Sequence, residues 1–311
     1  MNAQRTLIKA DLTPLAGARF QPTGFPDLGA AEFDGPDDTR SLLVESAQSM
    51  ANRLEATTWD EAHADQPEEL AALPYVRIIS RDGEFLSSSR LEAHRLASAY
   101  IMEGIVGTEV GEDWIRDRLG LAAGQPLDYR AVARGCFRLD PVSLVHGVFF
   151  ARKGTKSKPW PWQPKIARAV TSFIEAYQVR PVVSGGVKRD VVINEVAAGD
   201  TARGYGTVPH HRVEYTAEKI TAYFAIDHAQ FRSYGLSDAA TALLEALADF
   251  EIGSLLDGGL RLRTACDLIV RDVVGVRPDT QDAASRVSKL AADCSAELDP
   301  VTEVAWSGRG K

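Results

Sequence analysis

The chain has 311 residues, 45% of them apolar, and a formal net charge of −8, so it can bury a substantial core as one elaborated domain or as two. The negative charge argues against a nonspecific nucleic-acid binder, because Lys and Arg supply most phosphate affinity. No apolar run is long enough to cross a bilayer, residues 1–7 lack the apolar region of a secretory signal, and the three cysteines lack metal-ligand spacing. We therefore expect a cytoplasmic protein with reduced, buried thiols and no structural zinc.

The charge is unevenly distributed along the chain. Residues 27–70 hold twelve acidic side chains and two basic ones, whereas residues 150–190 hold nine basic and two acidic side chains. This asymmetry can concentrate phosphate binding in one groove. Equally, it can join copies of the chain, acidic face to basic face.

The N-terminal third begins with a predicted strand and a shaped loop. Residues 5–15 alternate well enough for a half-buried strand. The loop at 17–29 contains Pro22, Gly24, Pro26 and Gly29, which interrupt regular structure. Residues 30–33 and 41–44 flank a turn-rich segment and predict a hairpin.

A helix is predicted from Ser46 to about residue 57. Ser46 is a good N-cap, and Ala47, Met50 and Leu54 lie on one face. Free N–H groups and the positive dipole end favour an anion at such a start. The polar residues of the next turns can follow a phosphodiester chain. From residue types alone, an ordinary capped helix with a solvated polar face is the commoner outcome.

Residues 58–130 predict a subdomain inserted into a core, because no Pro/Ser-rich linker surrounds them. Within it we expect a strand at 75–79, a turn at residues 82–83, and helices at 89–100 and 112–119. His94 is interpreted as a packed or hydrogen-bonded residue of the first helix, since no second histidine follows at i+4.

The middle of the chain combines apolar and basic segments. Residues 142–151 predict a buried strand, and residues 166–177 an amphipathic helix. Between them, the loop at 152–165 interleaves four lysines and an arginine with Trp160 and Trp162. Basic groups with aromatic faces suit single-strand binding. A structural Trp-Pro clasp with solvated lysines explains the same residues equally well.

A Gly-Gly turn beside Lys188 and Arg189 is predicted at 184–190, before a predicted strand at 191–196. An RNA phosphate contact and a plain hairpin turn explain these residues equally well. The turn lacks the full P-loop pattern, which excludes a nucleotide triphosphatase of that class. Residues 210–215 and 219–226 predict paired strands. His210 and His211 are adjacent in the first of these, so they point to opposite faces and cannot both bind one metal.

The last third begins with the longest predicted helix, at 237–256. It ends before Gly258 and Gly259, and a strand at 260–270 with Arg261 and Arg263 follows. A final helix is predicted at 282–296. No GxSxG, HExxH or strand-linked GxGxxG motif occurs.

Several of these runs together resemble one known family. Residues 19–29 read Arg-Phe-Gln-Pro-Thr-Gly-Phe-Pro-Asp-Leu-Gly, and residues 44–55 read Val-Glu-Ser-Ala-Gln-Ser-Met-Ala-Asn-Arg-Leu-Glu. With shorter runs at 91–96, 144–149, 184–188 and 259–264, they resemble the RAMP backbone subunit of type I-G (formerly I-U) CRISPR effector complexes.

The resemblance implies an α+β fold with a ferredoxin-like (RRM-like) RAMP core and insertions that form fingers and a thumb. The chain is then one elaborated domain over 1–311, with a finger-like insertion at 58–130 and the basic loop at 152–165. It implies a subunit that polymerises along the crRNA spacer and presents bases to target DNA. The expected RNA-binding residues are Arg19, Gln21, Ser46, Gln48, Ser49, Asn52, Arg53, Lys153, Lys156, Lys158, Trp160, Trp162, Lys188, Arg189, Gly258, Gly259, Arg261 and Arg263.

The partners implied by the resemblance are crRNA, target DNA through the guide, further copies in a filament, a large subunit and a crRNA-processing and capping subunit. A helicase–nuclease joins later, and no membrane, cofactor, metal or catalytic residue is expected. The shortened Gly258-Gly259 loop departs from the fuller RAMP glycine signature. Two alternatives remain: an RNA endonuclease using Asp27 or His210/His211, and a phosphate-binding small-molecule enzyme.

Overall fold

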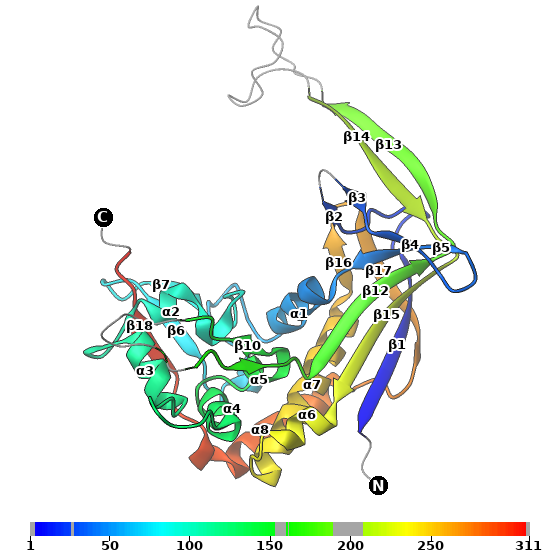
Figure 1. The fold of residues 1–311 in the computed structure, drawn as a ribbon. Helices are drawn as coiled ribbons and strands as arrows, with labels where there is room; N and C mark the ends of the chain where they lie inside the picture. The colour runs from blue at the N-terminus through cyan, green and yellow to red at the C-terminus, as the bar shows by residue number, and fades with distance from the viewer. Residues whose placement is uncertain (1–3, 26–27, 153–159, 161, 189–207, 309–311) are drawn as a thin grey trace, which may run out of the picture.

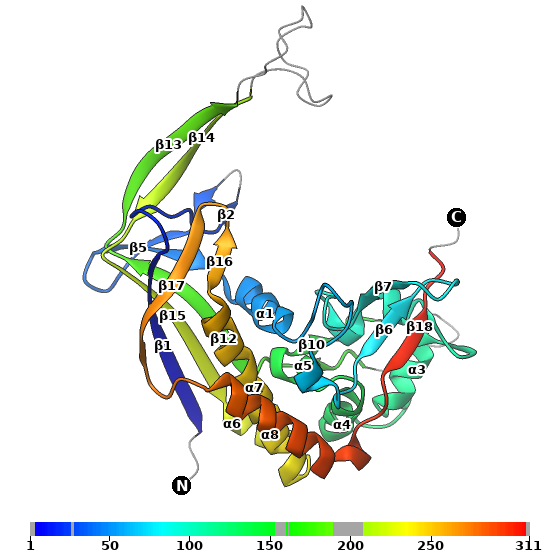
Figure 2. The ribbon, with the colours of Figure 1, turned by 180° about the vertical axis from the view of Figure 1, so that it is seen from behind.

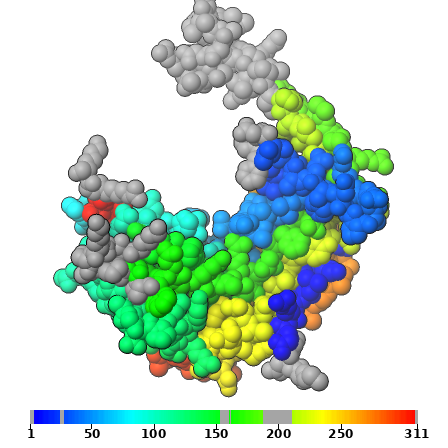
Figure 3. Space-filling model, in the orientation of Figure 1, coloured from blue at the N-terminus to red at the C-terminus, as the bar shows by residue number. Residues whose placement is uncertain are grey.

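The computed structural model describes residues 4–25, 28–152, 160, 162–188 and 208–308. The molecule is a crescent, with a sheet and a long hairpin on one side and a smaller lobe on the other (Figure 1). The space-filling view shows the hollow between the two sides (Figure 3). Within the described residues, no helix is long and apolar enough to span a membrane.

The core has the strand–helix–strand–strand–helix–strand order of a ferredoxin-like fold. Its six elements in chain order are β1 (Arg5–Pro14), α1 (Ala47–Ala56), β12 (Val170–Tyr177), β15 (Lys219–Asp227), α7 (Asp238–Gly258) and β17 (Cys266–Val274). The four strands lie in the sheet order β17-β1-β15-β12, and all neighbours are antiparallel. The expected α+β ferredoxin-like core is therefore confirmed.

Three further strands extend this sheet to seven. The hairpin of β4 (Glu32–Asp34) and β5 (Arg40–Glu45) joins the β12 edge, and β16 (Leu260–Arg263) joins the β17 edge. The predicted first hairpin is confirmed. The strand predicted at 260–270 is instead two antiparallel strands, because the chain reverses at Thr264–Ala265 between β16 and β17.

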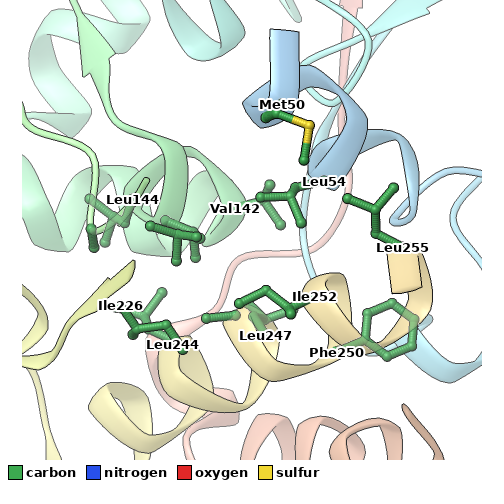
Figure 4. Packing of buried hydrophobic residues seen from close by; sticks show 14 of the residues in the cluster. Met50, Leu54, Val142, Leu144, Ile226, Leu244, Leu247, Phe250, Ile252 and Leu255 are labelled. Atoms are coloured by element: carbon green, nitrogen blue, oxygen red, sulfur yellow. The ribbon is translucent and has the colours of Figure 1, made fainter. Parts of the chain in front are cut away.

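Alternation along β1 decides which face of the sheet is buried. Ile8, Ala10 and Leu12 are buried, whereas Leu7 and Lys9 are exposed on the opposite face. The buried face packs against the helices, as period-two alternation requires. Figure 4 shows side chains of three helices gathered around this face: Met50 and Leu54 of α1, Val142 and Leu144 of α5 (Val142–His146), and Leu244 and Leu247 of α7 beside Ile226 of β15.

Both core helices start where their caps predict. Ser46 accepts a hydrogen bond from the Ser49 N–H at 3.2 Å, and Ser237 accepts one from the Ala240 N–H at 3.1 Å. The C-terminal helix α8 (Thr280–Asp293) packs along α7 (Figure 2). A short helix, α6 (His228–Ser233), connects β15 to α7.

The smaller lobe is built on a second sheet of five strands. Four come from the predicted insertion: β6 (Val76–Ile79), β7 (Phe85–Ser88), β8 (Ile105–Val106) and β9 (Glu109–Val110). The fifth, β18 (Thr302–Ala305), comes from the C-terminal end and lies between β6 and β8. The remaining elements of the lobe are α2 (Ala99–Met102), α3 (Gly111–Arg118), α4 (Tyr129–Leu139) and the 3₁₀ turns Glu68–Leu70 and Arg95–Ala97, with Ser295–Glu297 leading into β18.

Two short pairs and one long hairpin complete the element order. β2 (Gly24–Phe25) pairs with β3 (Gly29–Ala30), and β10 (Val148–Phe149) pairs with β11 (Lys165–Ile166). β13 (Arg180–Lys188) and β14 (Val208–Thr216) form a hairpin that rises from the end of the sheet (Figure 1). The predicted pairing of 210–215 with 219–226 is wrong, because β14 pairs with β13 while β15 pairs with β1 and β12.

In two segments the predicted secondary structure is wrong: one predicted helix is a strand, and one predicted strand begins as a helix. The segment predicted as a helix at 166–177 instead contains the end of β11 and strand β12 (Val170–Tyr177), whose buried row is Val170, Ser172, Ile174 and Ala176. The small polar and alanine members of that row hid the period of two. Residues 142–146 form helix α5, buried on all sides, so no periodicity separated a helix from a strand there.

The helix predicted at 89–100 is broken into turns. Arg95 has a φ of 52°, which ends any helix, and its guanidinium is buried against Glu55 of α1. Arg90 is likewise buried, 2.8 Å from Asp140. These two long-range ion pairs favour turns over a continuous helix. His94 is exposed instead of packed.

Candidate nucleic-acid interface

The hollow face of the crescent brings three distant segments together. A cavity of about 560 Å³ lies between residues 21–24 and 28–30 of the Gly/Pro loop, Arg212, Val213 and Tyr215 of β14, and Arg263 of β16. Helix α1 lies on the floor of the same hollow (Figures 1 and 2). The N–H of Phe20 bonds to the Tyr215 carbonyl at 2.9 Å, which fixes the loop to the foot of the hairpin.

A buried carboxylate, Glu45, organises one wall of this region. It is 2% exposed and accepts a hydrogen bond from Arg263, while the Arg53 Nη2 atom lies 3.6 Å away. Arg53 also donates to the Leu262 carbonyl at 2.6 Å, and Arg263 donates to the Gln21 carbonyl at 2.8 Å. One glutamate therefore holds two guanidinium groups from segments more than 200 residues apart.

A second buried carboxylate repeats this arrangement on the hairpin side. Glu214 is 3% exposed and lies 2.7 Å from Arg212 and 3.1 Å from Arg19. Arg19 additionally donates to the Ser184 hydroxyl at 3.2 Å. Each of the two clusters joins two positive groups to one negative group. Both consequently keep an excess positive charge that a phosphate can neutralise.

Tyr215 and Glu32 close the cavity between the clusters. The Tyr215 hydroxyl donates to the Glu32 carboxylate, which also lies 3.4 Å from Arg40. Burial, the larger cause, and this hydrogen bond, the second, together raise the pKa of Tyr215 to about 12. The phenol therefore stays neutral at physiological pH and acts as a hydrogen-bond group there.

The start of α1 presents the polar residues that the sequence singled out. Gln48 and Asn52 are exposed, whereas Ser46 and Ser49 are half-buried and bonded to each other. Gln21 is half-buried and lines the cavity. Arg53, on the same helix, is connected to the cavity wall through Glu45, which it shares with the lining residue Arg263.

The loop after α7 meets the same region through β16. Gly258 ends α7, and Gly259 follows with a φ of 79°, a conformation that favours glycine. Arg261 is exposed, and its carbonyl accepts from Arg53 at 3.4 Å. Among the arginines predicted to bind RNA, Arg19, Arg53 and Arg263 have intramolecular partners, whereas the Arg261 side chain is exposed.

The two tryptophans of the basic loop differ sharply. Trp160 is 6% exposed and stacks on Phe150, with ring centroids 6.1 Å apart. That burial contradicts base stacking by Trp160 and supports the structural clasp at this residue. Trp162 is 40% exposed, and its indole N–H donates to the Gln125 carbonyl at 3.0 Å.

Other predicted residues fall outside the described side chains. Lys153, Lys156, Lys158, Arg189 and Asp27 lie outside the described residues. Lys188 is described through its backbone, which pairs with Val208 in the hairpin. His211 is exposed on β14, and in the described ranges no group of three His, Cys, Asp or Glu side chains could hold a metal ion.

Sequence reasoning missed Arg212, Glu45 and Glu214. The Arg212–Val213–Glu214 alternation was visible, and it places the two charged side chains on one face of the strand. Nothing local distinguished Glu45, because its partner Arg263 is 218 residues away and meets it only through the sheet and the β16 turn.

Comparisons with known proteins relate the chain to CRISPR systems. The family model described as CRISPR-associated protein GSU0053 matches residues 6–181. No curated protein matches the chain.

Two solved structures are similar at low identity. One is titled "CRISPR RNA-guided surveillance complex, pre-nicking"; it has a TM-score of 0.43 and 12% identity, over 86% of this chain and 75% of that chain. The other is Csc2 of Thermofilum pendens, with a TM-score of 0.31 and 7% identity, over 94% of this chain and 76% of that chain.

Proposed function

The chain belongs to the family of CRISPR-associated protein GSU0053, and from that premise we propose that it is a crRNA-binding backbone subunit of a Cascade-type effector complex. Its hollow face holds the sugar–phosphate backbone of the guide, and the guide bases stay free to pair with target DNA. Sequence specificity then comes from base pairing. The type I-G assignment, which the sequence resemblance suggests, is part of the proposal, as is action in the cytoplasm.

One observation carries the proposal: two buried glutamates on the hollow face each hold two arginines. Glu45 holds Arg53 and Arg263, and Glu214 holds Arg19 and Arg212. The carboxylates fix the guanidinium planes, and the excess positive charge attracts an anionic chain despite the net charge of −8. Phosphate contacts of this kind position a nucleic acid without reading its sequence.

Further elements complete the proposed path of the RNA. The exposed amides of Gln48 and Asn52 extend it along α1, and Arg261 extends it beyond the α7–β16 turn. The exposed ring of Trp162 offers a stacking face. The lysines of the basic loop remain candidates from sequence alone.

Repeated copies are proposed to follow one another along the guide through a head-to-tail interface that does not close into a ring. The large subunit and the crRNA-processing and capping subunit would bind at the ends or along the side of this filament. The proposal includes no catalytic step, so it predicts intact guide RNA in the purified assembly.

The test is co-expression with guide RNA and the partner subunits, followed by the ratio of absorbance at 260 and 280 nm and the mass of the assembly. We expect a long, nuclease-resistant assembly that returns intact guide. Arg212→Gln and Arg261→Gln should each weaken RNA binding and lower the slope of log affinity against log salt by about one per lost phosphate contact. Lys289→Gln, on the exposed side of α8, removes the same charge away from the hollow and should leave the slope unchanged.

An RNA-free monomer in the presence of guide and all partners would contradict the proposal. Guide or target cleavage that is lost in His211→Ala would instead favour the endonuclease alternative. Equal effects of Arg212→Gln and Lys289→Gln would show that only overall charge matters, which would remove the hollow face as the binding site.

A further inference from the structure

The outer face of the core sheet is uncovered in the described part of the chain. Helices α1, α5 and α7 all pack on the inner face, where Ile8, Ala222 and Ile174 are buried. The outer side chains of β1, β15 and β12 are set by the strand register and lie in cross-strand rows. This face is separate from the hollow that carries the proposed RNA contacts.

One row of this outer face is largely apolar. Val274, Lys9, Tyr223 and Phe173 lie side by side across β17, β1, β15 and β12. The Tyr223 and Phe173 rings stack at 5.1 Å between centroids, and Val274 is 58% exposed. In the adjacent row, Leu7 is 51% exposed. Apolar side chains that gather on an exposed face in this way are typical of an interaction surface.

Two opposite charges on the patch lack an ion-pair partner within the described residues. The Lys9 ammonium lies over the Tyr223 ring, 5.9 Å from its centroid. Glu175 is half-buried one row further on, next to Thr221, and desolvation raises the pKa of its carboxyl. Lys9 is on β1 and Glu175 is on β12, so they flank β15 on its two sides.

This placement of charge is self-complementary. A two-fold axis between two facing sheets, passing over β15 near Ala222, lies midway between Lys9 and Glu175. The operation that it generates places each Lys9 opposite the Glu175 of a second copy, while the aromatic rows pack at the centre. We propose that the outer face of the core sheet binds a second copy of this chain in an isologous, face-to-face dimer held by two reciprocal Lys9–Glu175 ion pairs.

The charges of the face favour a protein partner over a nucleic acid. Besides Glu175, it carries Asp272 and Asp11, and Asp11 is already paired with Lys219 at 3.1 Å. Arg5 and Asp227 also lie on this face and pair with each other at 3.1 Å. Four carboxylates against three cationic groups do not attract phosphate. Sheets that pack face to face bury alternating side chains of this type, and ion pairs at the margin fix their register. The dimer leaves both hollows open.

The experiment uses the full chain, freed of nucleic acid, in sedimentation velocity over a range of concentrations. The wild type should convert from monomer to dimer as its concentration rises. Lys9→Glu and Glu175→Lys should each weaken dimerisation by at least about tenfold, because each places like charges opposite one another. Lys289→Glu is the matched control, with the same charge reversal on α8, and should dimerise like the wild type.

Mixing the two reversed variants gives the decisive result. In a mixed dimer, each introduced charge faces its opposite, so Lys9→Glu and Glu175→Lys should associate with each other although neither self-associates. That recovery also shows that both variants are folded. A wild type that stays monomeric, or variants that fail to recover on mixing, would overturn the isologous dimer. Single-stranded RNA that binds this face, and whose binding is lost in Lys9→Glu but not in Glu175→Lys, would also overturn the proposal.

Discussion

Arg95 of the small lobe donates to both carboxylate oxygens of Glu55 in α1, from Nε at 2.5 Å and from Nη2 at 2.7 Å. Both residues are buried, and Arg95 also donates to the Gly147 carbonyl at 3.0 Å. A buried, bidentate ion pair therefore joins the lobe to the helix on the floor of the hollow.

We expect Arg95→Ala to lower the free energy of unfolding by about 3–5 kcal/mol, because it leaves the Glu55 carboxylate buried and unpaired. Chemical denaturation measures the change. Arg277→Ala, which removes the exposed ion pair with Asp257, is the control and should cost about 1 kcal/mol or less. Equal costs for the two variants would contradict a structural role for the buried pair.

The two tryptophans of the basic loop should separate stability from RNA binding. Trp160→Ala should destabilise the fold by about 3–5 kcal/mol, because it removes a buried ring stacked on Phe150. Trp162→Ala should change stability by much less and should reduce ultraviolet crosslinking to guide RNA. Unchanged crosslinking in Trp162→Ala would remove this residue from the proposed path.

Glu175 should make the isolated monomer less stable as pH rises. Its folded-state pKa is raised by burial, so the folded chain holds the proton more tightly than the unfolded chain. The loss of stability caused by ionising this half-buried carboxyl is absent below its unfolded-state pKa and complete above its folded-state pKa. Glu175→Gln should therefore raise the melting temperature at neutral pH and converge with the wild type in acid.

Melting curves recorded at a concentration where the wild type is monomeric test this prediction. The nearby charges, Asp11 and Lys219, stay paired in both proteins, so they do not account for the difference. A Glu175→Gln variant less stable than the wild type at neutral pH would contradict the prediction.

Glu45→Gln should destabilise the protein, because it leaves Arg53 and Arg263 without their shared carboxylate. We expect added sulfate to restore part of the lost melting temperature, since an anion that bridges the two guanidinium groups binds only the folded state. Asp140→Asn is the control: its partner Arg90 is fully buried and beyond the reach of an added anion. Similar recovery in both variants would indicate a general salt effect.

Several elements of the fold followed from local sequence. The start of α1 at Ser46, the start of α7 at Ser237, strand β1 and the β4–β5 hairpin each have their signal within a few residues of the element. The ferredoxin-like core and the CRISPR family came from the resemblance of longer runs. The secondary structure of residues 142–146 and 170–177 was predicted wrongly. Helix α5 is buried on all sides and β12 has small residues in its buried row, so neither segment shows a clear hydrophobic period.

The residue types that can bind an anionic chain are evident from the sequence: Arg19 in the Gly/Pro loop, Arg53 on α1, and Arg261 and Arg263 after the Gly-Gly turn. Which of these arginines pair with a buried carboxylate is evident only from the fold. Glu45 meets Arg263 across 218 residues, and Glu214 meets Arg19 through the foot of the hairpin. Such pairing depends on sheet order and register, which place distant charges within a few ångströms, and no local pattern along the chain encodes that proximity.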